Sequence, residues 1–292
     1  MGFWKTLFGG EDPTPEQAKQ NADDRQFDLM KYDGVKALRM GQTDYAVKCF
    51  REALKVRDDM ETRDYLSQAL VRMGLLDEAQ EVLRTMMAAH PDNPAVVLEA
   101  AQVAFMQEDY STMTTLCEQA IALHADNPLS YYFYARAALG QGDPVSAIAR
   151  LTKALGIDEQ MGDARLLRAQ TLLTMGDIPG AREDTDWLLE HTEDHEDVLM
   201  LHARVTAAEG NAEQAIAIYS QAIDANPFNV EAYRERGRVR YNQGDHAGAL
   251  EDMEKVLELS PEEAAGVNGE FTAEGIEQKV KQAYSFMNPL GI

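Results

Sequence analysis

The sequence is poor in cysteine, in basic residues and in long apolar runs. Its two cysteines, Cys49 and Cys117, lie far apart and at or beside expected core positions. Such cysteines are typical of buried, reduced thiols, so we expect a cytoplasmic protein. No run approaches the roughly eighteen apolar residues that a membrane-spanning helix needs. These absences exclude a disulfide-stabilised scaffold and an integral helical membrane protein.

Basic side chains are outnumbered, with 27 Lys and Arg against 50 Asp and Glu and a net charge of −23. A surface of this sign repels phosphate backbones and anionic lipid, so no nucleic-acid partner is expected and a membrane partner is disfavoured. The sequence also lacks the G-x-S-x-G elbow, the Gly-Lys-Ser/Thr phosphate loop, a G-x-G-x-x-G turn and the H-E-x-x-H motif. We therefore expect no enzyme activity, no cofactor and no metal.

One local cluster, at residues 190–197, does contain residue types that bind metals. It reads Glu-His-Thr-Glu-Asp-His-Glu-Asp. The cluster falls across an expected turn, so its histidines need not share a helix face. Solvated loop charge explains it better than a metal site does.

What the sequence does contain is a short pattern that returns at a nearly constant interval. A column of small residues is spaced by 33 residues once and by 34 residues five times. Its members are Ala46, Ala79, Met113, Ala147, Ala181, Ala215 and Ala249. Apolar residues follow at offsets of four and seven, as on one face of a helix, and strand-like alternation is essentially absent. The sequence therefore predicts an all-α repeat protein.

A turn is expected five residues before each small-residue position. Six units have glycine there, and the third has Glu108 instead. The glycines are Gly41, Gly74, Gly142, Gly176, Gly210 and Gly244. Asn-Pro pairs at 93–94, 127–128 and 226–227 suit a helix N-cap followed by the first helical residue. Each unit should thus be a pair of helices.

This pattern resembles the tetratricopeptide repeat family, whose antiparallel helix pairs stack into a right-handed superhelix. The resemblance is clearest at 196–229, where Gly210, Ala215, Tyr219 and Ala222 are in place. It implies a right-handed α-α superhelix, a solenoid of seven units. Their expected bounds are 27–59, 60–93, 94–127, 128–161, 162–195, 196–229 and 230–263.

Segments on either side of the repeats have different expected roles. Residues 1–26 should be an apolar patch and a flexible leader, and residues 264–292 a capping helix, over 271–286, and a tail. The start of the chain also matches the bare myristoylation pattern. The apolar patch consists of Phe3, Trp4, Leu7 and Phe8. It is too short for a signal peptide.

Two arginine–aspartate pairs recur sixteen residues apart, Arg168 with Asp184 and Arg236 with Asp252. Where the arginine column holds His202, the aspartate column holds Ile218. This correlation predicts a buried ion pair between the two helices of one repeat, with a structural role rather than a catalytic one.

The resemblance also implies where a ligand binds, because in this family ligands lie along the concave face formed by the first helix of each repeat. The ligand-facing places are the second, fifth, ninth, twelfth and thirteenth of each unit. The candidate residues for this partner-binding groove are Leu98, Gln102, Phe105, Tyr132, Arg136, Leu166, Gln170, Met200, Arg204, Arg234 and Arg238. Long Gln and Arg donors suit the backbone carbonyls of a peptide, and the arginines favour an acidic segment.

Two alternatives to this groove follow from the same residues. The arginines can pair with acids between repeats while the apolar residues pack between first helices. The family's clamp for C-terminal carboxylates is disfavoured, because Lys31 is in a matching place but Val35 and Tyr65 replace its two asparagines.

The expected function is a non-enzymatic protein–protein interaction scaffold or adaptor that binds an apolar or acidic peptide segment of a partner. The alternative is a self-assembling or membrane-peripheral structural protein. In that case the segment Phe3-Trp4-Leu7-Phe8 inserts into a neighbour's groove or a lipid interface.

Overall fold

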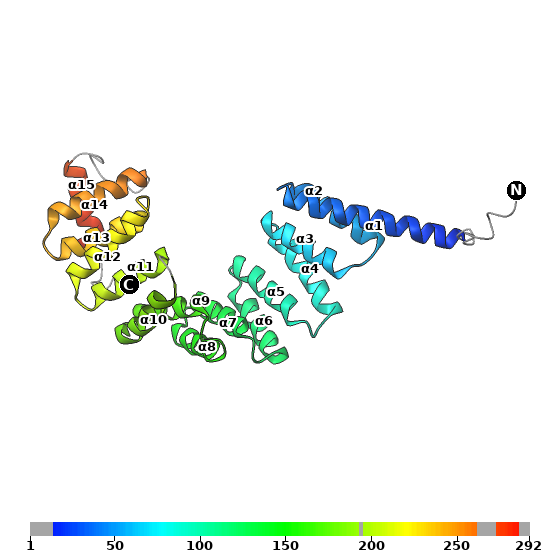
Figure 1. The fold of residues 1–292 in the computed structure, drawn as a ribbon, viewed down its shortest axis with the longest axis horizontal. Coiled ribbons are helices and arrows are strands. Elements are labelled where there is room, and N and C mark those ends of the chain that lie inside the picture. The colour runs from blue at the N-terminus through cyan, green and yellow to red at the C-terminus, as the bar shows by residue number, and fades with distance from the viewer. Residues whose placement is uncertain (1–13, 193–194, 262–272, 286–292) are drawn as a thin grey trace. The chain divides into compact units, whose positions relative to one another are not determined.

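The computed structural model describes residues 14–192, 195–261 and 273–285, and in these ranges the regular elements are helices, with no strand (Figure 1). The expected all-α fold is confirmed. The chain forms two compact units, Met1–Gln141 and Gly142–Ile292, and each is described by itself.

The first unit is a run of helices in which each packs against the next. In chain order they are α1 (Pro15–Arg39), α2 (Thr43–Val56), α3 (Met60–Arg72), α4 (Leu76–Ala89), α5 (Pro94–Met106), α6 (Tyr110–Leu123) and α7 (Pro128–Gly140). Beyond these neighbours, α1 also contacts α3 and α5 contacts α7, so first helices of successive repeats lie side by side. This is the packing expected of stacked helix pairs.

The second unit repeats the arrangement. Its helices are α8 (Pro144–Ile157), α9 (Gly162–Thr174), α10 (Ile178–His191), α11 (Glu196–Ala208), α12 (Ala212–Ala225), α13 (Val230–Asn242), α14 (His246–Leu259) and α15 (Ala273–Ser285). Helix α15 is the predicted capping helix. Its Ile276, Val280 and Tyr284 are buried in one cluster with Met253 and Val256 of α14, and they close the apolar side of the last repeat.

The turns inside the repeats have the predicted chemistry. All six turn glycines adopt a left-handed backbone, with φ between 72° and 86°. Glu108 holds the same conformation, at φ 57°, without being glycine. After three of these glycines comes an aspartate that caps the second helix: Asp143, Asp177 and Asp245 each accept a backbone N–H.

The N-caps of the first helices agree with the prediction at two junctions and differ at one. Asn93 and Asn127 accept the backbone N–H of Ala95 and Leu129, as expected. At 226–227 the expectation was wrong. Helix α13 begins at Val230 because Asn229 supplies the cap, accepting from the Ala232 N–H at 2.8 Å.

Helix α1 begins at Pro15, inside the stretch where the sequence predicted a flexible leader. A capping box starts it, because Thr14 and Gln17 each accept the other's backbone N–H. Further along, Asp24 accepts from Arg57, which follows α2, at 3.1 Å. Capping and this long-range contact explain why the segment is helical.

The two predicted ion pairs are confirmed. Asp184 and Asp252 are nearly inaccessible, and each binds the arginine sixteen residues earlier. Each aspartate also contacts a second arginine, Arg165 for the first and Arg240 for the second. Two cations around one buried carboxylate satisfy its charge.

Both cysteines are buried, free thiols, as expected. Burial raises the pKa of Cys117 to about 12, with the charge of Glu118 as a smaller cause, so this thiol stays protonated at neutral pH. Among the described residues, no helix has the length and apolar character to cross a membrane.

Candidate functional site

The first helices of the first unit carry an aromatic and cationic patch. The Arg136 guanidinium on α7 stacks 3.8 Å from the centre of the Phe105 ring on α5 and 5.8 Å from that of Tyr132. On the same two helices, Met106 is 50% exposed and Leu129 is 46% exposed. Three predicted site residues are thus in contact, on helices that also carry apolar side chains reaching solvent.

A pocket of about 390 Å³ lies next to this patch, between α3 and α5. We call it the α3–α5 pocket. Its lining residues are Ser67, Gln68, Val71, Arg72, Leu83, Glu99, Gln102, Val103 and Met106. Five of these, Gln68, Val71, Arg72, Gln102 and Met106, occupy ninth, twelfth or thirteenth places of the second and third repeats. The places expected to face a ligand therefore do border one cavity.

Glu99 gives the α3–α5 pocket its chemical character. Burial raises the pKa of its carboxyl to about 7, and the charge of Asp64 on α3 adds to the shift. Among the described residues, no side chain forms a hydrogen bond or ion pair with Glu99. The pocket thus holds a half-buried carboxyl group that has no donor of its own.

Asp64 is only partly satisfied. Its Oδ2 accepts from Gln68 Nε2 at 3.1 Å, while its Oδ1 is buried and finds no donor among the described residues. Ser67 also lines the pocket, but its hydroxyl donates to the Asp64 carbonyl oxygen of its own helix, at 2.8 Å. Neither arrangement provides the base next to a nucleophile that covalent catalysis requires.

The remaining candidates in the first unit differ in accessibility. Gln102 is exposed and borders the pocket. Leu98 is only 6% exposed and packs in the core with Val97 and Ala101, so it offers little surface to a ligand.

In the second unit, the candidate residues are mostly engaged within the protein. Met200 is 6% exposed and belongs to a core cluster. Leu166 packs half-buried against another core cluster, and Gln170 is half-buried on the same helix, α9.

The candidate arginines of the second unit already have acidic partners. Arg204 donates to Glu231 at 3.2 Å, and Arg234 also pairs with Glu231. Arg238, which is buried, pairs with Glu235. An acidic ligand would have to displace these glutamates to reach the arginines.

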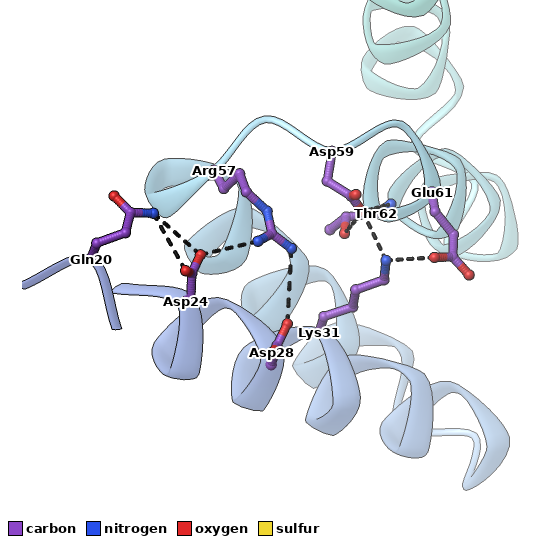
Figure 2. Close-up of polar contacts among 8 residues, drawn as sticks. All are labelled: Gln20, Asp24, Asp28, Lys31, Arg57, Asp59, Glu61 and Thr62. Carbon is purple, nitrogen blue, oxygen red and sulfur yellow. Dashed lines mark hydrogen bonds and ion pairs between the residues drawn. The ribbon is translucent and has the colours of Figure 1, made fainter. Parts of the chain in front are cut away.

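Lys31, the residue that matches the family's carboxylate clamp, is also occupied. Figure 2 shows its ammonium group between Asp59, at 2.8 Å, and Glu61, at 2.5 Å. Desolvation of the lysine is outweighed by these contacts, so its pKa is raised. The contacts join α1 to the start of α3 and leave no free ammonium group for a ligand carboxylate.

The two histidines of the 190–197 cluster have separate contacts. His191 stacks on Trp187, with ring centres 4.0 Å apart, and His195 lies 3.9 Å from Asp197. Residues 193–194 are outside the described ranges, as is the apolar segment with Phe3 and Trp4. In the part of the chain that is described, no three His, Cys, Asp or Glu side chains gather as a metal site.

Sequence reasoning missed Glu99, because the sixth place of a repeat is not among the five ligand-facing places. A signal was nevertheless present. Glu99 is the only charged residue in the α5 sequence PAVVLEAAQVAFM. An isolated charge in a buried apolar helix indicates either a partner or a binding site.

Comparison with known proteins places this architecture in a family. Sequence profiles of the tetratricopeptide repeat match residues 60–103, 138–205 and 200–264. Together with the helix pairs, the turn glycines and the interval of 34 residues, they show that the chain belongs to the tetratricopeptide repeat family.

Two curated relatives cover different shares of the chain. Tetratricopeptide repeat protein 36 of Bos taurus is 38% identical over 81 residues, which are 28% of this chain and 40% of that protein. DnaJ homolog subfamily C member 3 of Gallus gallus is 21% identical over 255 residues, covering 77% of this chain and 51% of that protein. The matches thus span about half or less of these relatives.

Solved structures share the fold at low sequence identity. A tetratricopeptide repeat protein from Parabacteroides merdae has a TM-score of 0.67 and 15% identity, over 89% of this chain and 99% of that one. YrrB, described as having an unusual peptide-binding site, has a TM-score of 0.54 and 14% identity, over 70% of this chain and 99% of that one. At such identities the likeness shows the fold alone.

Proposed function

We propose that this protein is a non-enzymatic adaptor that binds a peptide segment of a partner protein on the first helices of its repeats. The observation that carries the proposal is the α3–α5 pocket, which is bordered by places expected to face a ligand in two successive repeats. Gln68 and Gln102 border it one repeat apart and offer amide groups to peptide carbonyls. A protein of the same fold, YrrB, has a peptide-binding site, so the fold can perform this function.

The aromatic patch extends this proposed surface toward α7. Phe105 and Tyr132 hold Arg136 by cation–π contacts, and the exposed Met106 and Leu129 lie on the same two helices. A rigid aromatic and arginine group beside apolar side chains is the composition typical of binding hot spots. We place this protein in the cytoplasm, where its free, buried cysteines stay reduced.

Affinity capture from the native cell lysate tests the proposal. Wild type is compared with Tyr132→Ala/Arg136→Ala, and captured proteins are identified by mass spectrometry. Proteins that the double variant fails to retain, while its circular dichroism spectrum stays native, support binding on this surface. The control is Arg84→Ala/Thr85→Ala, which changes exposed residues of the second helix α4. Identical profiles for all three proteins contradict the proposal.

Self-association through the apolar N-terminal segment is a separate proposal. Deleting residues 1–12 and measuring mass by light scattering tests it. Loss of an oligomer supports assembly through Phe3, Trp4, Leu7 and Phe8. An unchanged mass contradicts self-association, and the adaptor function is then the remaining proposal.

A further inference from the structure

The α3–α5 pocket identifies the chemistry of the peptide it accepts. Resting on the proposed function, we propose that this pocket receives an Arg or Lys side chain of the bound peptide, with its cationic head at Glu99. This gives the pocket a basic ligand, whereas the arginines considered from sequence favour an acidic one.

The lining of the pocket matches the shape of such a side chain. Val71, Leu83, Val103 and Met106 supply apolar surface, and Glu99 supplies a carboxyl group within it. Arginine and lysine have a long apolar stem and a charged tip, and they are stabilised where the stem contacts apolar atoms and the tip meets an acid. The volume of about 390 Å³ leaves room for a long side chain.

The carboxyl groups at this site lack a cation. Glu99 has no hydrogen-bond or ion-pair partner among the described residues, and Asp64 keeps one buried oxygen without a donor. A half-buried carboxylate that is not paired is destabilised, and an incoming cation removes that cost. The raised pKa of Glu99, about 7, agrees with the absence of a cation, because burial and the charge of Asp64 both disfavour its charged form.

Two cations on the helices α1 and α3 do not fill the role, because they are held elsewhere. Lys31 is held by Asp59 and Glu61, and Arg63 is held by Asp58 at 2.6 Å. Arg72 lines the pocket and forms no ion pair with any other residue in the described ranges. It is exposed, and its guanidinium is free to donate to the backbone carbonyls of a peptide. The net charge of −23 also attracts basic segments over a longer range.

Selection from a random heptapeptide display library tests the proposal. The full chain is immobilised as wild type, as Glu99→Gln and as the control Glu108→Gln, which removes an exposed carboxylate after α5. Wild type and the control are expected to enrich peptides with Arg or Lys at one aligned position. Glu99→Gln should lose that preference while keeping a native circular dichroism spectrum.

An enriched peptide, made synthetically, then measures the contact. We expect it to bind Glu99→Gln at least about tenfold more weakly than wild type. Replacing its basic residue with norleucine should weaken binding to wild type by the same factor as the Glu99→Gln substitution does. The same peptide change should weaken binding to Glu99→Gln little further. This second change leaves the protein untouched, so it tests the contact independently of folding.

The outcomes separate this inference from the proposed function. If wild type enriches peptides without a basic position, or if Glu99→Gln enriches the same basic peptides, the basic-ligand inference is wrong and peptide binding stands. If wild type enriches no peptide at all, the proposed function fails and the inference fails with it.

Discussion

The guanidinium group of Arg168 on α9 forms a two-point contact with Asp184 on α10. Its Nε donates to Oδ2 at 2.8 Å and its Nη2 donates to Oδ1 at 2.7 Å. The same arginine also donates from Nη1 to the hydroxyl of Thr152 on α8, at 3.1 Å. One side chain thus joins three helices from two successive repeats.

The last repeats contain the same arrangement. Arg236 on α13 contacts Asp252 on α14 and donates to the hydroxyl of Ser220 on α12 at 2.9 Å. In both cases the hydroxyl lies sixteen residues before the arginine and the aspartate sixteen residues after it. The arginine–aspartate correlation in the sequence therefore captured only part of the contact. The arginine also bonds a hydroxyl of the preceding repeat and so bridges two repeats.

Removing Asp252 should destabilise the second unit. Asp252→Ala leaves Arg236 and Arg240 without their shared carboxylate. We expect a loss of about 3 kcal/mol in the free energy of unfolding, because an uncompensated, partly buried charge is costly. Urea titration followed by circular dichroism measures it. Peptide affinity at the first unit should not change.

A matched control and a rescue sharpen this test. Asp224→Ala, which removes an exposed aspartate on α12, should leave the unfolding midpoint unchanged. Replacing both partners, as in Arg236→Met/Asp252→Leu, should recover part of the loss, since only Arg240 then loses its contact with Asp252. If Asp252→Ala is as stable as wild type, the ion pair does not stabilise the folded protein.

Glu108→Gly should stabilise the first unit. Glu108 is held at φ 57°, a left-handed conformation that disfavours residues with a side chain. Glycine removes that strain but loses more entropy on folding, and the net gain should be about 0.5–1 kcal/mol. Thermal unfolding of the two proteins measures the difference.

The opposite change at Gly74 provides the control. A Cβ added there meets no atom within 4 Å, so Gly74→Ala tests the backbone conformation alone, at φ 72°. It should lower stability by about 1 kcal/mol. A stabilising Gly74→Ala or a destabilising Glu108→Gly would show that the left-handed backbone does not govern these turns.

The stability of the first unit should depend on pH through Glu99. Its folded pKa of about 7 lies above the value of 4.5 expected without the fold. The folded state therefore binds more protons between these values, and the contribution of Glu99 to stability falls as pH rises from about 4.5 through 7. Urea unfolding of wild type and Glu99→Gln at several pH values measures this contribution as a difference.

The variant removes the titrating group while other acids and histidines remain, so their effects cancel in the comparison. Relative to wild type, Glu99→Gln should gain stability with rising pH and level off above about 7. A stability difference that is independent of pH would mean that the pKa of Glu99 is not raised. An NMR titration of the labelled Glu99 carboxyl carbon reports the same pKa directly.

Lys31 should hold the pKa of Asp59 low. Partial burial raises the pKa of Asp59, but hydrogen bonds from Lys31 and Thr62 outweigh it and bring the value to about 2. Asp59 thus contributes stability above its unfolded pKa of 3.8, and this is lost as pH falls toward 2. Lys31→Met should raise the pKa of Asp59 and lower stability by about 1 kcal/mol.

NMR titration of the Asp59 carboxyl group checks this prediction. Lys48→Met, at an exposed position on α2, removes the same charge elsewhere and should leave the Asp59 pKa unchanged. Equal shifts in both variants would point to the overall charge rather than to the contact drawn in Figure 2.

Features that depend on local spacing could be predicted from the sequence. Three of them recur at fixed intervals, so they are unlike chance matches: the turn glycines, the small-residue column and the arginine–aspartate pairs. The start of α1 was not predicted, because a capping box and a distant contact with Arg57 stabilise a segment of polar composition.

The candidate site was less predictable because neighbouring places on a helix differ by about 100° in direction. A small rotation of each helix decides whether a side chain such as Leu98 or Met200 faces solvent or the core, and both are 6% exposed. The partners of Arg204 and Arg238 also depend on how successive helices pack. The same uncertainty concealed Glu99, which borders the pocket from a place that is not among the five expected to face a ligand.

The turn glycines have a consequence for how the repeats can be combined. Among them, Gly41, Gly142 and Gly210 would each admit a Cβ into open space, so the bend is set by the backbone and not by packing around the glycine. The angle between the two helices of a repeat is then a local property of that repeat. It should stay the same if the repeat is placed in another array. Variation in the curvature of such arrays must arise at the junctions between repeats, where asparagine caps and arginine contacts differ from one junction to the next.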